Sequence, residues 1–158
     1  MIIRCAELVD YESINRLYNQ LHKEHVANRP DYYKHTEEVF SKDDLDKYIS
    51  SDRMEFFVAV NDANKVFGFI EYEIREDEES EVLQQRSVIY LNALVTDINY
   101  RNRGIAGELF RYALADGRKH NIDAIELNVW KFNTEAIRFY ESLGMEIKSI
   151  RYELEIKD

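Results

Sequence analysis

The chain has 158 residues, 45% of them hydrophobic, which suits one folded domain with a core of its own over residues 1–158. Its net charge of −10 argues against nucleic acid as the main partner, because phosphate backbones select basic surfaces. No apolar run approaches the ~20 residues of a membrane span, so we expect no membrane partner.

The same acidity favours a cationic partner such as an amine or a basic peptide, although it also serves solubility. Cys5 is the only cysteine, which excludes an internal disulfide and is typical of a cytoplasmic protein. His22 and His25 lie three residues apart, as a metal-binding pair can, but no cysteine or further histidine at a suitable spacing supports a metal site. We therefore expect a cytoplasmic protein without a metal.

The first third of the chain predicts a strand and two helices. Residues 2–8 suit a strand, and Asp10 can cap a helix that runs to about residue 24. Residues 26–36 contain the only proline and are expected to be irregular. Ser41 begins a second helix to about residue 50, with Asp44 at the spacing of a capping box.

The middle of the chain predicts a hairpin and a buried strand. Residues 55–60 and 66–74 have strand patterns, and the turn residues 62–65 join them. The acidic residues 76–81 are expected to form a solvated loop. Residues 88–96 are apolar enough for a central strand.

The last third predicts alternating elements. A helix is expected over residues 104–120, a strand over 124–130, a helix over 134–143 stopped by Gly144, and strand-like structure over 145–156. The strands 88–96 and 124–130 should be parallel with a right-handed crossover, because a long helix joins them. The order of elements predicts a mixed α/β domain with helices on both faces of a sheet.

The run Arg101-Asn102-Arg103-Gly104-Ile105-Ala106 lies between the predicted strand 88–96 and the following helix. The first N–H groups of a helix lack intrahelical partners, and the helix dipole adds positive potential there. Gly104 and Ala106 have little or no side chain, so a pyrophosphate can approach the backbone closely. The run therefore predicts an anion site.

Two further patterns follow. Leu127-Asn128-Val129 is followed by Asn133, and Phe139-Tyr140-Glu141-Ser142-Leu143-Gly144-Met145 comes after it. With Arg101-x-x-Gly104-x-Ala106, they resemble the GNAT superfamily, the acyl-CoA-dependent N-acetyltransferases. The resemblance is strong over residues 88–147. It implies an α/β (α+β) fold with a mixed central sheet of about six or seven strands, about four flanking helices and two splayed parallel central strands.

The resemblance also implies acetyl-CoA as cosubstrate. Its pantetheine arm would run beside the strand 88–96 and bond main-chain groups, and its pyrophosphate would rest on the loop before the helix. For Leu94 and Val95 the alternative is simple core packing, and for Asn133 it is a helix cap. For Arg101 and Arg103 the alternative is a solvated loop, whereas Arg101 is expected to contact the cofactor or to fix the loop. The residues implied to bind the cofactor are Leu94, Val95, Thr96, Arg101, Asn102, Arg103, Gly104, Ile105, Ala106, Gly107, Asn133 and Tyr140.

The resemblance implies that Tyr140 protonates the departing thiolate, which a tyrosine of pKa ~10 can do at neutral pH. A buried aromatic is its alternative role. The attacking amine must lose a proton, yet Asn92 and Asn128 stand where some family members have carboxylates. Neither can act as a base, and our hypothesis is a water held by these asparagines or by main-chain carbonyls. Glu71, Glu73 and Glu126 are the alternative candidates for the base. Carboxylates at such strand positions are more often surface charges or members of cross-strand pairs.

The family resemblance places Tyr32 and Tyr33 in the region that lines the acceptor pocket. The acceptor is expected to be a small amine or polyamine, or a peptide N-terminus. A non-catalytic acyl-CoA-binding module that regulates a partner is the alternative function. Homodimers are common in the family, so a homodimer is compatible with the sequence.

Overall fold

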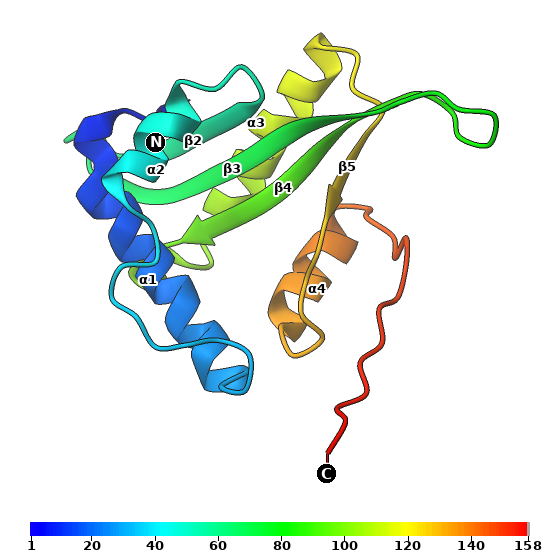
Figure 1. Ribbon diagram of the computed structural model, residues 1–158. Coiled ribbons are helices and arrows are strands. Elements are labelled where there is room, and N and C mark those ends of the chain that lie inside the picture. The colour runs from blue at the N-terminus through cyan, green and yellow to red at the C-terminus, as the bar shows by residue number, and fades with distance from the viewer. Residues whose placement is uncertain (158) are drawn as a thin grey trace. The chain divides into compact units, whose positions relative to one another are not determined.

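The computed structural model describes residues 1–157 and contains a five-stranded sheet with the strand order β1-β2-β3-β4-β5 (Figure 1). The predicted α/β class is confirmed, whereas the expected six or seven strands are reduced to five in the described residues. The strands are β1 (Ile2–Cys5), β2 (Met54–Val60), β3 (Val66–Asp77), β4 (Arg86–Thr96) and β5 (Ala124–Leu127). The helices are α1 (Tyr11–Asn28), α2 (Lys42–Ile49), α3 (Ile105–Lys119) and α4 (Thr134–Ser142), with short 3-10 turns η1 (Leu8–Asp10) and η2 (Ile98–Tyr100).

The sheet is an antiparallel meander from β1 to β4 with one parallel strand, β5, added at the end. The long helix α3 connects β4 to β5, and their predicted parallel pairing is confirmed. In Figure 1, α1 and α2 cover one face of the sheet and α3 covers the other. The end of β4 therefore leads directly from the sheet into η2 and the first turn of α3.

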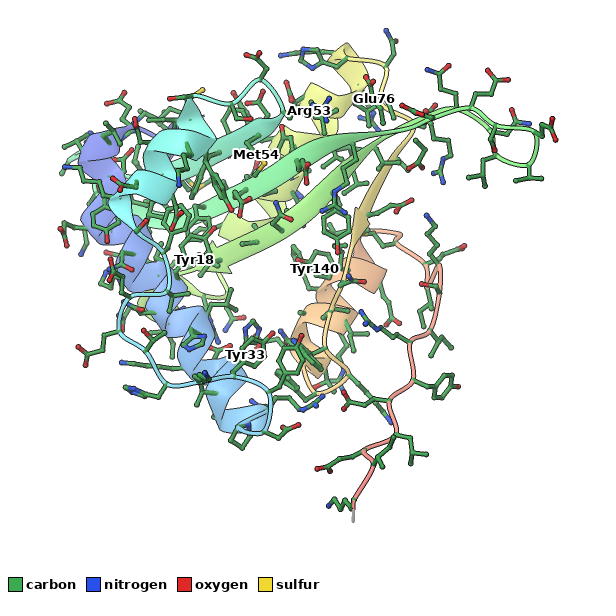
Figure 2. All side chains as sticks on the ribbon, in the orientation of Figure 1. Tyr18, Tyr33, Arg53, Met54, Glu76 and Tyr140 are labelled. Carbon is green, nitrogen blue, oxygen red and sulfur yellow. The ribbon has the colours of Figure 1, made fainter. Side chains whose placement is uncertain are left out.

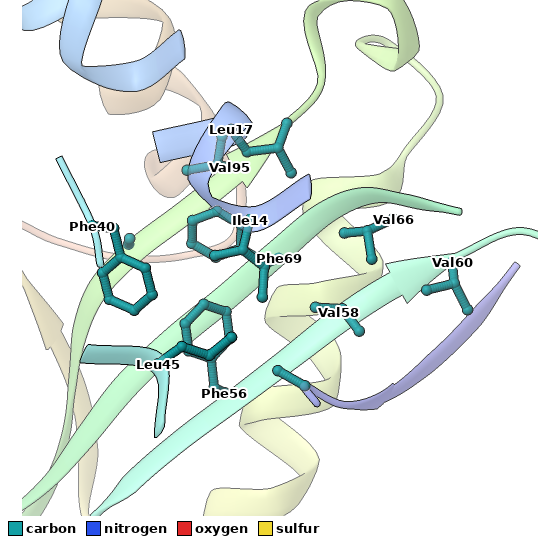
Figure 3. Close-up of a cluster of buried hydrophobic side chains, with 12 residues drawn as sticks. Ile14, Leu17, Phe40, Leu45, Phe56, Val58, Val60, Val66, Phe69 and Val95 are labelled. Carbon is teal, nitrogen blue, oxygen red and sulfur yellow. The ribbon is translucent and has the colours of Figure 1, made fainter. Parts of the chain in front are cut away.

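The main core lies between the sheet and the helices α1 and α2 (Figure 3). Ile14 and Leu17 of α1 and Leu45 of α2 are fully buried against Phe56 and Phe69 of the sheet. Burying one such side chain contributes about 1.5–3 kcal/mol, so this cluster fixes both helices on the sheet. The predicted capping box of α2 is also confirmed, because the Ser41 hydroxyl accepts the N–H of residue 44 at 3.1 Å.

The opposite face of the sheet receives α3 at close range. A Cβ on Gly68 of β3 would lie 3.0 Å from the Val95 carbonyl oxygen and 3.1 Å from a methyl group of Ile105. A side chain at this position would have to displace the Val95 carbonyl or Ile105, so glycine favours the close approach of the start of α3 to the end of β4.

Asp10 stands at the N-terminus of α1 as predicted, but its side chain does not cap the helix. Asp10 precedes the helix, but its carboxylate forms an ion pair with Arg4 at 2.8 Å and accepts the Glu7 N–H at 2.8 Å. It therefore ties the connection after β1 to the strand itself. The helix continues to Asn28, beyond the predicted end near residue 24.

The chain divides into two compact units, Met1–Asn128 and a second unit that begins at Val129. The second unit contains α4, which ends at Ser142 and is followed, after the C-cap Leu143, by the predicted Gly144 in a left-handed conformation (φ 87°). The strand expected over 145–156 is wrong, since none of residues 145–157 is in a strand. That residues 1–158 act as one domain stays a prediction. Among residues 1–157, no helix is both long and apolar enough to cross a bilayer.

Candidate active site

The strand β4 loses its β5 neighbour part of the way along its length. Parallel pairing extends only from Val88 to Leu91, opposite residues 124–127. β4 continues to Thr96, and residues 92–96 pair with no strand on that side in the described chain. This is the splayed arrangement that was expected, and it leaves a strand edge to which an extended ligand can add.

A β-bulge lies at the point where the two strands part. Glu71 of β3 is opposite Ala93, and Tyr72 is opposite Leu91, so Asn92 is the additional residue of β4. A bulge bends its strand and redirects a side chain. The Asn92 side chain is exposed here, although it begins a stretch whose neighbours are buried.

The turn from η2 into α3 has the geometry predicted for an anion site. Asn102 and Gly104 both have left-handed backbone, with φ of 60° and 76°. By helical geometry, the N–H groups of Ile105, Ala106 and Gly107 have no partner inside the helix. A Cβ on Gly104 would meet no heavy atom within 4 Å, so the space next to the helix start is open.

Asp97 anchors the beginning of this turn. Its buried carboxylate accepts the Asn99 N–H at 2.9 Å and forms an ion pair with Arg16 of α1 at 2.8 Å. Burial alone would raise the pKa of Asp97, but the Asn99 N–H and Arg16 outweigh burial and hold the pKa below its usual value. The carboxylate thus stays ionised and keeps the turn attached to α1.

The two arginines of the motif are held by neighbouring side chains. The Arg101 guanidinium contacts Glu24 of α1 at 2.6 Å, which supports the loop-fixing role. The Arg103 guanidinium lies 5.1 Å from the centre of the Tyr100 ring, and that ring stacks on Phe67. Neither contact tests whether these arginines also reach a phosphate.

The side-chain amide of Gln20 on α1 forms two hydrogen bonds with the main chain at the end of β4. Its Nε2 donates to the Thr96 carbonyl at 3.0 Å, and its Oε1 accepts the Ile98 N–H at 3.0 Å. One of the three residues predicted to bond pantetheine through the main chain therefore has its carbonyl engaged. The main-chain groups of Leu94 and Val95 therefore stay the better candidates for hydrogen bonds with the pantetheine arm.

Glu71 is a buried carboxylate directly behind Asn92. Only 2% of the residue is exposed, its Oε1 accepts Asn92 Nδ2 at 2.7 Å, and its Oε2 accepts the Tyr18 hydroxyl at 2.8 Å. Tyr18 extends from α1 (Figure 2), and its ring contacts the rings of Phe40 and Phe69, with 4.5 and 4.7 Å between ring centres. Burial raises the pKa of Glu71, although both hydrogen bonds favour the ionised form.

The three candidate carboxylates are thus in different environments. The surface interpretation of Glu71 is wrong, whereas Glu73 forms an ion pair with Arg75 at 2.9 Å. Glu126 of β5 lies 3.5 Å from Arg86 of β4, which is the cross-strand pair expected.

Asn128 immediately follows β5. Its Nδ2 donates to the Tyr90 hydroxyl of β4 at 2.6 Å, and the Arg75 guanidinium lies 3.7 Å from the Tyr90 ring centre. Asn92 and Asn128 therefore serve different networks, and only Asn92 contacts a buried acid.

In the second unit, Asn133 and Tyr140 belong to α4. Asn133 Oδ1 accepts the Ala136 N–H at 3.1 Å, so its cap role is confirmed. A cap uses only the side-chain oxygen and does not test a contact of the amide N–H groups with the cofactor. Burial raises the pKa of Tyr140 to about 12, which keeps its hydroxyl protonated at neutral pH.

Tyr32 and Tyr33 lie in the connection after α1. The Tyr33 ring, labelled in Figure 2, stacks on the His25 ring with 5.0 Å between ring centres. It meets the Tyr32 ring edge to face, also at 5.0 Å. Tyr32 is exposed. The acceptor role of both residues stays a prediction, but their rings attach this connection to the last turns of α1.

Sequence reasoning missed the polar contacts that α1 makes with the sheet. The sequence patterns gave no polar role to Arg16, Tyr18 or Gln20. The available signal was their spacing: Arg16 and Gln20 are four residues apart and therefore on one side of the helix.

The Acetyltransferase (GNAT) family profile matches residues 14–145. This chain therefore belongs to the GNAT family, as its three motifs predicted.

Solved structures and a curated relative agree with this assignment. A point mutant of the BH1408 protein from Bacillus halodurans is 31% identical, with a TM-score of 0.97 over 99% of this chain and 100% of that chain. The aminoglycoside N-acetyltransferase AAC(6')-Iy, in complex with CoA, is 18% identical, with a TM-score of 0.73 over 99% of this chain and 100% of that one. At that identity, the likeness shows the fold alone.

An uncharacterized N-acetyltransferase in the pepI 3' region of Lactobacillus delbrueckii subsp. lactis is 24% identical over 109 residues. These residues are 64% of this chain and 62% of the relative, so the match spans less than two thirds of the relative's length.

Proposed function

We propose that the chain transfers an acetyl group from acetyl-CoA to a primary amine, without a covalent enzyme intermediate. The observation that carries this proposal is the left-handed turn at Asn102 and Gly104, placed beside the open edge of β4. One feature suits a diphosphate and the other suits an extended amide-bearing arm. CoA contains both, and the related fold of AAC(6')-Iy is known in complex with CoA.

The proposed cofactor residues act mainly through their main chains. The N–H groups of residues 102–107 would hold the pyrophosphate, and Leu94 and Val95 would bond the pantetheine amides. An N–H near Val95 or Thr96 would meet the oxyanion that forms on the attacked carbonyl. The Asn133 amide would donate to the pantetheine arm, a role taken from the family resemblance. Acetyl-CoA supplies the activated acyl carbon and a thiolate leaving group.

Glu71 is the proposed proton acceptor. An alkylamine is mostly protonated at neutral pH and must lose a proton before its nitrogen can bond the acyl carbon. Asn92 is exposed and hydrogen-bonded to Glu71, so a water beside Asn92 can take the amine proton and pass one to the carboxylate. Tyr18 holds the other carboxylate oxygen and acts as a positioning residue.

Tyr140 is the proposed proton donor to the sulfur when the carbon–sulfur bond breaks. Tyr140→Phe should lower kcat by about 10²–10⁴-fold, the usual contribution of general acid catalysis. The dissociation constant of acetyl-CoA should change little, because the ring remains. Steady-state kinetics together with calorimetric binding measures both quantities.

Tyr152→Phe is the matched control, because it removes a hydroxyl from a side chain that is 89% exposed. It should leave both constants unchanged. Native turnover in Tyr140→Phe would remove this residue from the mechanism.

The proposed activity is tested by thiol release from acetyl-CoA with a panel of polyamines, small monoamines, basic peptides and acidic peptides. The net charge of −10 favours the cationic acceptors. Saturable cofactor binding without thiol release from any acceptor would instead support the non-catalytic regulatory module. The buried acid Glu71 favours catalysis, since a module that only binds needs no proton acceptor.

A further inference from the structure

A row of side chains in mutual contact crosses three strands of the sheet and includes a guanidinium group. Asn128, directly after β5, donates through Nδ2 to the Tyr90 hydroxyl of β4 at 2.6 Å. The Arg75 guanidinium of β3 lies over the Tyr90 ring, 3.7 Å from the ring centre, and Arg75 Nε donates to Glu73 at 2.9 Å. The acetyl transfer that we propose uses none of these four side chains.

Arg75 is held in one orientation, yet part of its guanidinium stays available. Stacking on the Tyr90 ring and the hydrogen bond through Nε together restrain the plane of the group. Its two terminal nitrogens form no hydrogen bond within residues 1–157, and 46% of the side chain is exposed. Two N–H groups on one edge of a guanidinium match the two oxygens of a carboxylate. This edge of Arg75 can therefore bind an anion.

Arg75 shares a face of the sheet with the proposed proton acceptor. Glu71, Glu73 and Arg75 alternate along β3 and therefore point to one side, which is the side that α1 covers. Tyr90 is opposite Glu73 in the register, and Asn92 is in the bulge beside Glu71. Two strand residues, roughly 7 Å, thus separate the ring under the guanidinium from the place proposed for the reacting amine.

The charges on this face differ from one end to the other. Glu73 contacts Nε of Arg75, and Glu126 of β5 lies 3.5 Å from Arg86. Glu71 instead accepts hydrogen bonds from two neutral side chains and has no cationic partner within residues 1–157. An ammonium group is therefore attracted to the end with Glu71. An anion is attracted to the terminal nitrogens of Arg75, because Glu73 occupies Nε alone.

We propose that Arg75 binds a carboxylate of the acceptor, so that the acceptor is a primary amine with a carboxylate about 7 Å from its nitrogen. This inference rests on the proposed acetyl transfer and names the class of its acceptor. Tyr90, Asn128 and Glu73 are positioning residues, because they act through Arg75. In a chain of net charge −10, an acceptor needs such a cation to bring an anionic group to this face.

Two kinds of molecule have this chemistry. One is a straight-chain ω-amino acid of about five carbons, and the other is a peptide whose second residue is aspartate, since two extended residues span about 7 Å. A peptide with aspartate as its second residue and the same peptide with asparagine there should be compared alongside the small amines. Preference for the aspartate peptide over the ω-amino acid would identify the peptide as the source of the carboxylate.

The main test compares δ-aminovalerate with pentylamine, which has the same chain length and no carboxylate. At saturating acetyl-CoA, thiol release by the native chain should give a KM about 10–100-fold lower for δ-aminovalerate, the usual effect of a charge-assisted hydrogen bond. The KM ratio of the two amines should fall to about one in Arg75→Gln. Arg118→Gln removes the same charge from an exposed position at the end of α3 and should keep the native ratio.

Two further variants separate binding from a structural effect. Tyr90→Leu removes the ring under the guanidinium and should lower the KM ratio by a smaller factor than Arg75→Gln, with little change in kcat. Arg75→Glu should reverse the preference, so that the diamine cadaverine has a lower KM than δ-aminovalerate. A general loss of folding would lower the rate with every amine and would not reverse this order.

Calorimetric titration of both amines into the CoA-bound chain separates this inference from the proposed reaction. Equal affinities of the native chain for the two amines, or a preference that persists in Arg75→Gln, would overturn the carboxylate site while leaving acetyl transfer to other amines intact. Preferential binding of δ-aminovalerate that depends on Arg75, without thiol release from any amine, would instead overturn the acetyl transfer and retain the carboxylate site.

Discussion

Replacing Gly104 by glutamate should abolish the binding of acetyl-CoA. The backbone at this position is left-handed (φ 76°), which a residue with a Cβ adopts at a cost of about 1–2 kcal/mol. The space that the side chain would enter is open, and it adjoins the helix start that we assign to the pyrophosphate. The new carboxylate would both occupy this space and repel the phosphates. Isothermal calorimetry should show no saturable binding at concentrations that saturate the native chain.

Gly144→Glu is the matched control for this experiment. Gly144 is also left-handed (φ 87°) and also has no heavy atom within 4 Å of its ideal Cβ. The variant therefore carries similar backbone strain and the same new charge at another place. It should bind acetyl-CoA normally. Near-native affinity in Gly104→Glu would contradict the proposed cofactor site.

Glu71→Gln should lower kcat/KM by about 10²–10⁴-fold and remove the acidic limb of its pH profile. Burial raises the pKa of Glu71 above its ordinary value of 4.5, and only the ionised form accepts a proton. The native rate should therefore fall as the pH drops through this raised pKa. The glutamine side chain can still accept from Asn92 and donate to the Tyr18 oxygen, so the packing should persist.

Two variants separate proton acceptance from a structural effect. Glu73→Gln changes the next carboxylate on the same face of β3, which pairs with Arg75, and should keep the acidic limb. Tyr18→Phe removes a hydrogen bond that favours the ionised form of Glu71, so the limb should move to higher pH. An unchanged limb in Glu71→Gln would rule out Glu71 as the proton acceptor.

The raised pKa of Glu71 also predicts how the free energy of unfolding depends on pH. The folded chain holds the Glu71 proton more tightly than the unfolded chain does, because the folded pKa is raised. The contribution of Glu71 to the free energy of unfolding should fall as the pH rises from the ordinary glutamate value through the folded pKa. Urea unfolding across this window should show a flatter pH dependence in Glu71→Gln than in the native chain.

Local patterns predicted the parts of the site that depend on local backbone. Gly104 and Ala106 after an apolar strand indicated the helix start, and the structure has the left-handed turn there. Asn133 before α4 indicated a cap, which is present. Such features depend on a few neighbouring residues, so their spacing in the sequence is sufficient.

The position of Glu71 could not be predicted in the same way. Its contact with Asn92 depends on the bulge in β4, which shifts the register by one residue against β3. Its contact with Tyr18 depends on how α1 crosses the sheet. One signal was available: Glu71 is the single charge within residues 66–72, an otherwise apolar run typical of a strand buried on both faces.

The strand predicted over residues 145–156 is absent for a different reason. Its alternation indicated a strand, yet strand structure also requires a neighbouring strand, and this chain does not supply one in residues 1–157. A pattern in one sequence does not specify whether the pairing partner is in the same chain or in another.

The contact of Gln20 with the end of β4 and the contact of Glu24 with Arg101 attach the turn before α3 to the helix α1. The same last turns of α1 support the connection that contains Tyr32 and Tyr33 through the stacked His25 and Tyr33 rings. We expect a ligand that restrains the turn before α3 to restrain the proposed acceptor region as well. We therefore expect acetyl-CoA and the acceptor to strengthen each other's binding, and thermodynamic reciprocity makes the factor the same in both directions.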